Sequence, residues 1–154
     1  MRFPTGNNSN HILLRKSIAQ FERMISIMQQ ARIIGIITSA VLDALGEEGQ
    51  LYKVGDIIYL GESNVNHIKR RHSSDYTKYG DRLSQIILDP DYVGINEEDD
   101  SLEYVKVFDN HVKVVVRVAG DDRLYIRSLY TVYQSRTEFF IKTGRLKPLT
   151  KMVE

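Results

Sequence analysis

Two histidines enclose a short basic run in the sequence His67-Ile-Lys-Arg-Arg-His72. Imidazole titrates near neutral pH, so a histidine can accept or release a proton during a reaction, and arginine binds phosphate oxygens through two parallel hydrogen bonds. Cleavage of RNA without a metal ion needs a base for the 2′-hydroxyl, an acid for the leaving 5′-oxygen, and cations that stabilise the charge on phosphorus. His67 and His72 are therefore candidates for the acid and the base. The cations between them are candidates for RNA binding: Lys69, Arg70 and Arg71.

The histidine pair has two other interpretations. Five residues along a helix turn by about 140°, so the two rings point to different sides, unlike the i, i+4 pair of a zinc protease. We therefore expect no metal site here. The chain has no cysteine, which excludes disulfides, thiolate nucleophiles and cysteine-based metal centres. The remaining alternative is that both histidines are exposed polar residues of a basic helix.

A second group of candidates lies in Arg127-Ser-Leu-Tyr130, within a predicted strand. A guanidinium in the middle of a strand needs an acidic side chain or a bound anion as its partner. Arg127 is therefore a candidate for stabilising charge on phosphorus, and Arg117 is an alternative. Tyr130 has a plainer interpretation as a core residue with a hydrogen-bonded hydroxyl.

The alternation of side chains in two neighbouring strands leaves two pairings open. One strand has Val112, Val114, Val116 and Val118 on one face, and the next has Leu124, Ile126, Ser128, Tyr130 and Val132 on one face. If these two sets share a face, the other, more open face carries Lys113, Arg117 and Arg127. A two-residue turn at Gly120-Asp121 would instead pair Val114 with Arg127 and exchange the faces. We favour the first pairing because it makes one face almost entirely apolar.

The segments that position these residues are helical in the first half and mostly extended in the second. Apolar residues spaced by four, three, four and three (Leu14, Ile18, Phe21, Ile25 and Met28) predict a helix with one buried stripe over 9–32. Further helices are predicted over 36–45, 65–71, 73–79 and about 83–87, with a strand over 57–60. Three antiparallel strands follow over 103–108, 111–118 and 123–133, and a capping box at Ser135 opens a last helix that runs to Lys142. This order indicates an α+β fold.

Charge is balanced overall but sorted by segment. The 154 residues carry a formal net charge of +1. Residues 89–103 hold seven acids and no Lys or Arg, which we interpret as a solvated loop, whereas 136–151 holds five cations and one acid. Bulk neutrality therefore does not argue against an RNA partner. The longest near-apolar stretch, 33–42, is far shorter than the roughly 18 residues that span a bilayer, so we expect no membrane association.

Residues 35–148 resemble phage- and prophage-associated nuclease-like domains of the barnase, EndoU, colicin-nuclease and RelE-like superfamily. The resemblance is carried by 58–72, 76–80, 87–94, 101–106, 114–117 and 125–130. It implies N-terminal helices packed on a four-stranded antiparallel sheet, followed here by the C-terminal helix. The domain is then expected over 35–154, with 1–34 as a helical extension.

The resemblance also implies a function. Members of the superfamily are proposed to be metal-independent ribonucleases, found as toxin domains and in phage proteins. By position, the catalytic candidates are His67, His72, Arg127, Ser128 and Tyr130, and RNA contacts are expected from Lys69, Arg70, Arg71, Lys113 and Arg117. We expect an endoribonuclease without a cofactor that acts on RNA such as tRNA in the bacterial cytoplasm and has a cognate immunity or antitoxin protein. The alternative is a non-catalytic domain that binds RNA or protein.

Overall fold

The computed structural model describes residues 8–150, without the side chains of residue 8 and residues 27–30. The helices are α1 (Asn8–Gln30), α2 (Ser39–Leu45), η1 (Gly46–Leu51), α3 (Glu62–Arg71), α4 (Ser73–Tyr79), η2 (Gly80–Arg82), α5 (Leu83–Leu88) and α6 (Gln134–Lys142). The strands are β1 (Arg32–Ile36), β2 (Ile57–Leu60), β3 (Tyr92–Ile95), β4 (Leu102–Val107), β5 (His111–Val118), β6 (Leu124–Val132) and β7 (Leu146–Pro148). The α+β fold class is confirmed.

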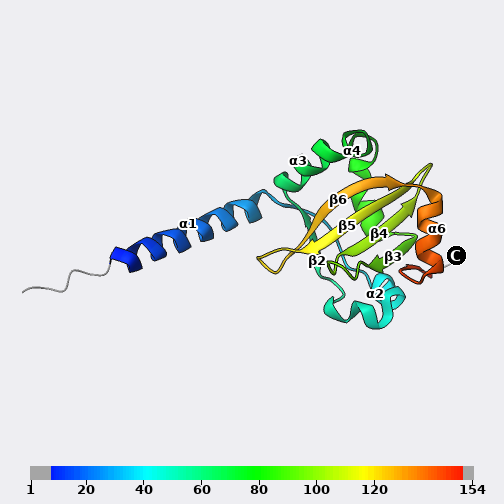
Figure 1. The fold of residues 1–154 in the computed structure, drawn as a ribbon, viewed down its shortest axis with the longest axis horizontal. Helices are drawn as coiled ribbons and strands as arrows, with labels where there is room; N and C mark the ends of the chain where they lie inside the picture. The colour runs from blue at the N-terminus through cyan, green and yellow to red at the C-terminus, as the bar shows by residue number, and fades with distance from the viewer. Residues whose placement is uncertain (1–7, 151–154) are drawn as a thin grey trace, which may run out of the picture.

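One sheet with helices on both faces forms the body of the molecule (Figure 1). Its strand order is β1-β2-β6-β5-β4-β3-β7. All neighbours are antiparallel except β2 and β6, which run parallel. Helices α2 to α5 supply apolar side chains to the main core on one face, where they meet the buried valines of β5. On the other face α6 packs through Phe140 against Val105 and Leu146.

The expected four-stranded antiparallel sheet is wrong, because the sheet has seven strands and is mixed. The missing strands β1, β3 and β7 have only three to five residues each. Strands this short carry too few alternations to be distinguished from loops. β3 lies inside the acidic segment whose composition predicts a solvated loop, and Glu103 at the end of that segment is a buried residue of β4.

The favoured pairing of β5 with β6 is confirmed for only part of the strands. Val116 pairs with Ile126 and Val118 with Leu124, as expected, but the register shifts between Val115 and Val116. Beyond that β-bulge, Leu129 takes the place on the core face that the alternation predicts for Ser128 and Tyr130. Those two side chains instead share a face with Lys113 and Val115, because Ser128 pairs with Val115 and Tyr130 with Lys113. A bulge adds one residue to one strand and so reverses the alternation beyond it.

Helix α1 forms as expected, but its apolar stripe is not buried. Leu14, Ile18 and Phe21 are 57%, 49% and 58% exposed. The helix projects away from the sheet (Figure 1). The predicted stripe residue Met28 has its side chain outside the described residues. Within the described part of the chain, no helix is long and apolar enough to cross a membrane.

Helix α6 has the expected extent but not the expected cap. The residue before its first turn is Tyr133, and no side chain caps the helix there. Ser135, the predicted start of a capping box, lies inside the helix.

β1 begins at Arg32, so this strand crosses the expected boundary between 1–34 and 35–154.

Candidate functional site

Helix α3 lies beside the second half of β6, and the surface along this contact is called the α3–β6 seam here. β2 pairs with β6 only at Ile58 and Tyr59, so it covers only the beginning of β6. α3 follows β2 directly, and α3 and α4 pack against the rest of that strand. Asp75 of α4 accepts a hydrogen bond from the backbone N–H of Thr131 at 3.0 Å. The helices therefore satisfy part of the strand edge that β2 leaves open.

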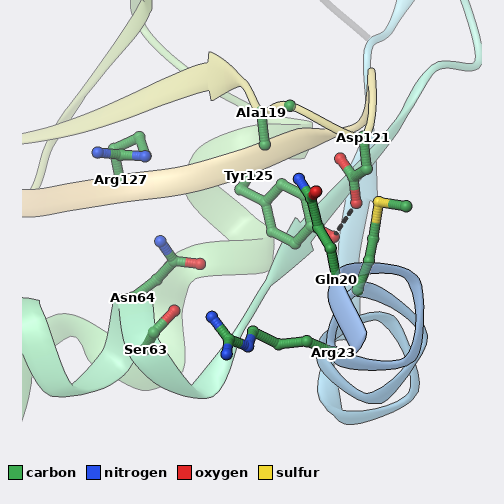
Figure 2. Close-up of a pocket in the computed structure, with 10 residues that line it drawn as sticks. Gln20, Arg23, Ser63, Asn64, Ala119, Asp121, Tyr125 and Arg127 are labelled. Carbon is green, nitrogen blue, oxygen red and sulfur yellow. Dashed lines mark hydrogen bonds between the residues drawn. The ribbon is translucent and has the colours of Figure 1, made fainter. Parts of the chain in front are cut away.

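A pocket of about 430 Å³ opens at the start of the seam. Its lining comes from α1, the first turn of α3, the loop between β5 and β6, and β6 itself: Gln20, Arg23, Met24, Ser63, Asn64, Ala119, Gly120, Asp121, Tyr125 and Arg127. Figure 2 shows Asn64 and Arg127 facing this space from the helix and the strand, with Arg23 reaching in from α1. Two guanidinium groups therefore line one small pocket.

The acidic group in this pocket already has partners. One carboxylate oxygen of Asp121 accepts a hydrogen bond from the Tyr125 hydroxyl at 2.8 Å, and the other accepts one from the backbone N–H of Arg123 at 3.0 Å. Burial and this carboxylate raise the pKa of Tyr125 to about 12. Asp121 therefore fixes the loop between β5 and β6 and makes no ion pair with Arg23 or Arg127.

Arg127 is the extra residue of the β-bulge in β6, between Ile126 and Ser128. Bulges occur often beside active sites because they redirect a side chain. Arg127 is exposed and forms no ion pair with a carboxylate in the described part of the chain. A strand arginine without an acidic partner is available to an anion.

His72 and Tyr130 meet farther along the seam. The ring of His72, in the junction between α3 and α4, stacks on the ring of Tyr130 with centroids 5.0 Å apart and planes 24° apart. Burial raises the pKa of the Tyr130 hydroxyl, and the negative charge of Glu103 raises it further. Tyr130 therefore remains protonated near neutral pH, so its hydroxyl can donate a hydrogen bond beside the imidazole.

His67 lies between these two ends of the seam. It follows Ser63 by four residues and Asn64 by three, so it projects from the same side of α3 one turn beyond the pocket. Its side chain is exposed. His72 and Arg127 therefore lie on the seam, and His67 lies on α3 beside it with an exposed side chain. Only His72 has a ring contact to β6, and no described pocket is lined by all three residues.

The three cations between the histidines do not act as one group. Arg71 follows His67 by four residues and lies on the same side of α3. Lys69 turns toward α4, with its ammonium 5.5 Å from the centre of the Tyr76 ring. Arg70 is exposed and lies between the directions of Lys69 and Arg71, away from the buried Ile68. Arg71 is therefore the cation of this run that best fits a ligand in the seam.

A buried ionic cluster on the sheet face that carries Tyr130 was missed in the sequence. Glu103 is only 2% exposed and pairs with both Lys113 and Arg145. The Arg145 Nε and one terminal nitrogen donate to the same carboxylate oxygen at 2.9 and 2.6 Å. The charge of Lys113, an expected RNA contact, is therefore taken up by Glu103. The sequence signal for this cluster was that Glu103 and Lys113, which carry opposite charges, lie in adjacent predicted strands.

Arg117 lies in a more acidic setting than Arg127. It lines a pocket of about 390 Å³ with Tyr52, Asp99 and Asp100. A hydrogen bond from the Ser101 hydroxyl lowers the pKa of Asp99, and the charge of Arg117 lowers it further. These carboxylates compete with a phosphate for Arg117. Arg127 is the better placed of the two arginines for a bound anion.

The described residues contain no group of three or more His, Cys, Asp or Glu side chains arranged to hold a metal ion. A protein family described as phage-Barnase-EndoU-ColicinE5/D-RelE like nuclease3 matches residues 31–138. No curated protein and no solved structure matches the chain. The matched range contains the whole α3–β6 seam but not α1.

Proposed function

Because the chain belongs to the phage-Barnase-EndoU-ColicinE5/D-RelE like nuclease3 family, we propose that it is an endoribonuclease whose active site is the α3–β6 seam. The observation that carries the proposal is the stack of His72 on Tyr130, in the same seam as Arg127, a cation without a carboxylate partner. Proton transfer and stabilisation of a charged phosphate are the two tasks that RNA cleavage imposes.

The proposed reaction uses no group outside the chain and its substrate. One imidazole, of His67 or His72, accepts the proton of the 2′-hydroxyl, and the 2′-oxygen forms a bond to phosphorus. The bond from phosphorus to the 5′-oxygen breaks, and the other imidazole protonates the leaving oxygen. The products are a 2′,3′-cyclic phosphate and a 5′-hydroxyl. Arg127 neutralises the added charge on phosphorus, and the hydroxyls of Ser128 and Tyr130 are further donors to its oxygens.

The pocket at the start of the seam fits the nucleotide next to the cleaved phosphate. It begins one helical turn from His67, a rise of about 5.4 Å. Arg23 and Arg127 line it together with the amide of Asn64, and such groups bind phosphate and sugar oxygens. RNA binding in the seam would thus extend beyond the family match, because Arg23 belongs to α1.

The remaining expectations are part of the same proposal. The substrate class is single-stranded or looped RNA, with tRNA as the first candidate, because an unpaired base can enter the pocket of about 430 Å³ at the start of the seam. A nuclease of this kind acts as a toxin in the bacterial cytoplasm and requires an immunity or antitoxin protein in the cell that makes it. A cover over the basic seam would inhibit the enzyme directly.

Cleavage of total RNA by the purified chain tests the proposal. We expect cutting in the presence and absence of EDTA, a loss of cutting in His72→Ala and His67→Ala, and wild-type cutting in His11→Ala. His11 is an exposed histidine of α1 outside the seam, so it is the matched control. Melting curves close to that of the wild type would show that the variants are folded. RNA left intact by the wild type would contradict the proposal.

RNA binding separates the enzyme from a non-catalytic binding domain. A 2′-O-methyl oligonucleotide lacks the attacking hydroxyl, so its affinity can be measured without cleavage. Arg71→Ala should weaken binding more than Arg70→Ala, although each variant removes one positive charge from α3. Equal losses would indicate that only the net charge of the helix matters. Salt-dependent binding to RNA without any cleavage would favour the non-catalytic alternative.

A further inference from the structure

The apolar stripe of α1 is turned away from the body of its own molecule. The side of α1 that lines the pocket carries Gln20, Arg23 and Met24. With 100° between successive residues of a helix, Ile18 lies about 160° from Gln20 and Phe21 about 160° from Arg23, while Phe21 is about 60° from Met24 at the edge of the pocket side. Both are exposed. The domain to which α1 is attached therefore leaves Leu14, Ile18 and Phe21 of the stripe uncovered, and only Ile25 is half-buried.

The spacing of the stripe is that of a coiled coil. Leu14, Ile18, Phe21 and Ile25 recur at intervals of four, three and four residues, which is the repeat of positions a and d in a heptad. This stripe is narrower than the broad apolar face with which a helix packs onto a globular core. A second helix with the same repeat is the partner that such a stripe accepts.

We propose that α1 pairs in an antiparallel coiled coil with α1 of a second copy of this chain. In the register that sets Ile18 against Phe21 of the second copy, Leu14 meets Ile25 at both ends. The symmetric pairing of one patch with itself is the usual form of a dimer with a two-fold axis. An antiparallel pair also places the two nuclease domains at opposite ends of the paired helices, where they do not collide.

The charged residues beside the apolar stripe of α1 favour an antiparallel orientation of the two helices. Arg15 and Glu22 occupy equivalent e positions, which face each other across the seam when two such helices run in opposite directions. The register above brings Arg15 of each copy against Glu22 of the other, which gives two ion pairs by symmetry. A parallel pair would instead bring Ser17 against Glu22 and would form no ion pair at these positions. Charge complementarity therefore favours a second, antiparallel copy.

Sedimentation velocity of the full chain over a range of concentrations tests the proposal, together with a charge exchange. Arg15→Glu alone and Glu22→Arg alone should each weaken the dimer about tenfold, because each sets like charges against each other in both pairs. The double variant Arg15→Glu, Glu22→Arg should restore it. Lys16→Glu makes the same charge change as Arg15→Glu on the outer side of α1 and should leave the dimer unchanged.

The relative orientation of the two α1 helices can be measured by disulfide crosslinking of introduced cysteines, because the chain contains no cysteine of its own. Leu14→Cys mixed with Ile25→Cys should form a disulfide between the two variants, whereas Leu14→Cys alone should not crosslink to itself. The proposal is overturned if the chain is monomeric at every concentration, if the double variant does not recover the dimer, or if Leu14→Cys crosslinks efficiently to itself. None of these outcomes depends on RNA cleavage, so the proposed function is tested separately.

Discussion

At the scale of single residues, the contact between His72 and Tyr130 links the helix motif to the strand motif. Tyr130→Phe keeps an aromatic ring for His72 to stack on but removes the hydroxyl. If that hydroxyl donates to the phosphate in the transition state, we expect the variant to melt like the wild type and to cleave RNA about 100-fold more slowly in single turnover. A wild-type rate would show that the ring serves only to position His72.

The buried carboxylate of Glu103 is expected to be essential for stability. Glu103→Ala would leave Lys113, with a side chain only 8% exposed, and Arg145 without their common partner. Loss of one member of a buried ion pair costs about 3–5 kcal/mol. Urea unfolding should show a loss of this size.

A surface pair provides the comparison for Glu103. Glu48 pairs with Lys147 at 3.6 Å, and their side chains are 44% and 34% exposed. Glu48→Ala should cost no more than about 1 kcal/mol, because water screens such pairs. Similar losses in the two variants would mean that the Glu103 cluster stabilises the fold no more than a surface pair does.

Asp109 gives the fold a defined acid dependence. Hydrogen bonds from Lys78 and then Tyr79 lower the pKa of its carboxyl from 3.8 to about 2. A group with a lowered pKa stabilises the folded state fully above the unfolded value, and this contribution is lost as the pH falls through the folded value. The difference in melting temperature between the wild type and Asp109→Asn should therefore be constant above about pH 4. It should shrink toward about pH 2, and a difference that persists unchanged there would contradict the assignment.

At the scale of elements, Gly94 allows β7 to pack beside β3 and so positions Arg145. A Cβ at Gly94 would lie 2.0 Å from the carbonyl oxygen of Arg145. Gly94→Ala must therefore separate the two strands, and we expect a loss of about 1–3 kcal/mol or more in the free energy of unfolding. Gly120 has no atom within 4 Å of its Cβ position, so Gly120→Ala should change stability by no more than about 0.5 kcal/mol. Equal losses of stability in Gly94→Ala and Gly120→Ala would show that the pairing of β7 with β3 does not require a glycine at position 94.

The longer elements were predictable because their patterns repeat several times. The periodicity of α1 and the valine alternation of β5 identify both elements, and the helix motif from His67 to His72 lies where it was expected. The bulge at Arg127 was not predictable, since one inserted residue reverses the faces without changing the composition. The parallel contact of β2 with β6 joins residues 66 positions apart in the sequence, and local patterns do not specify such a pairing.

At the scale of the whole molecule, the near-zero net charge hides a difference between charged side chains that form ion pairs within the fold and those that do not. Glu103 and Asp89 of the acidic segment form ion pairs with Lys113 and Lys106, so part of the expected negative surface is neutralised within the fold. Arg127 and Arg71 have no such partners among the described residues. Residue counts could not distinguish paired from unpaired charges, which is why the seam emerges only from the three-dimensional arrangement.

The most direct test of the account uses an oligonucleotide of deoxyribonucleotides with a single ribonucleotide in its centre. Attack by a 2′-hydroxyl in the α3–β6 seam predicts one cut, immediately 3′ of the ribonucleotide, in the presence of EDTA. The cut should leave a 2′,3′-cyclic phosphate and be lost in His72→Ala but not in His11→Ala. Cleavage at deoxyribonucleotides, or an undiminished cut by His72→Ala, would contradict the central claim.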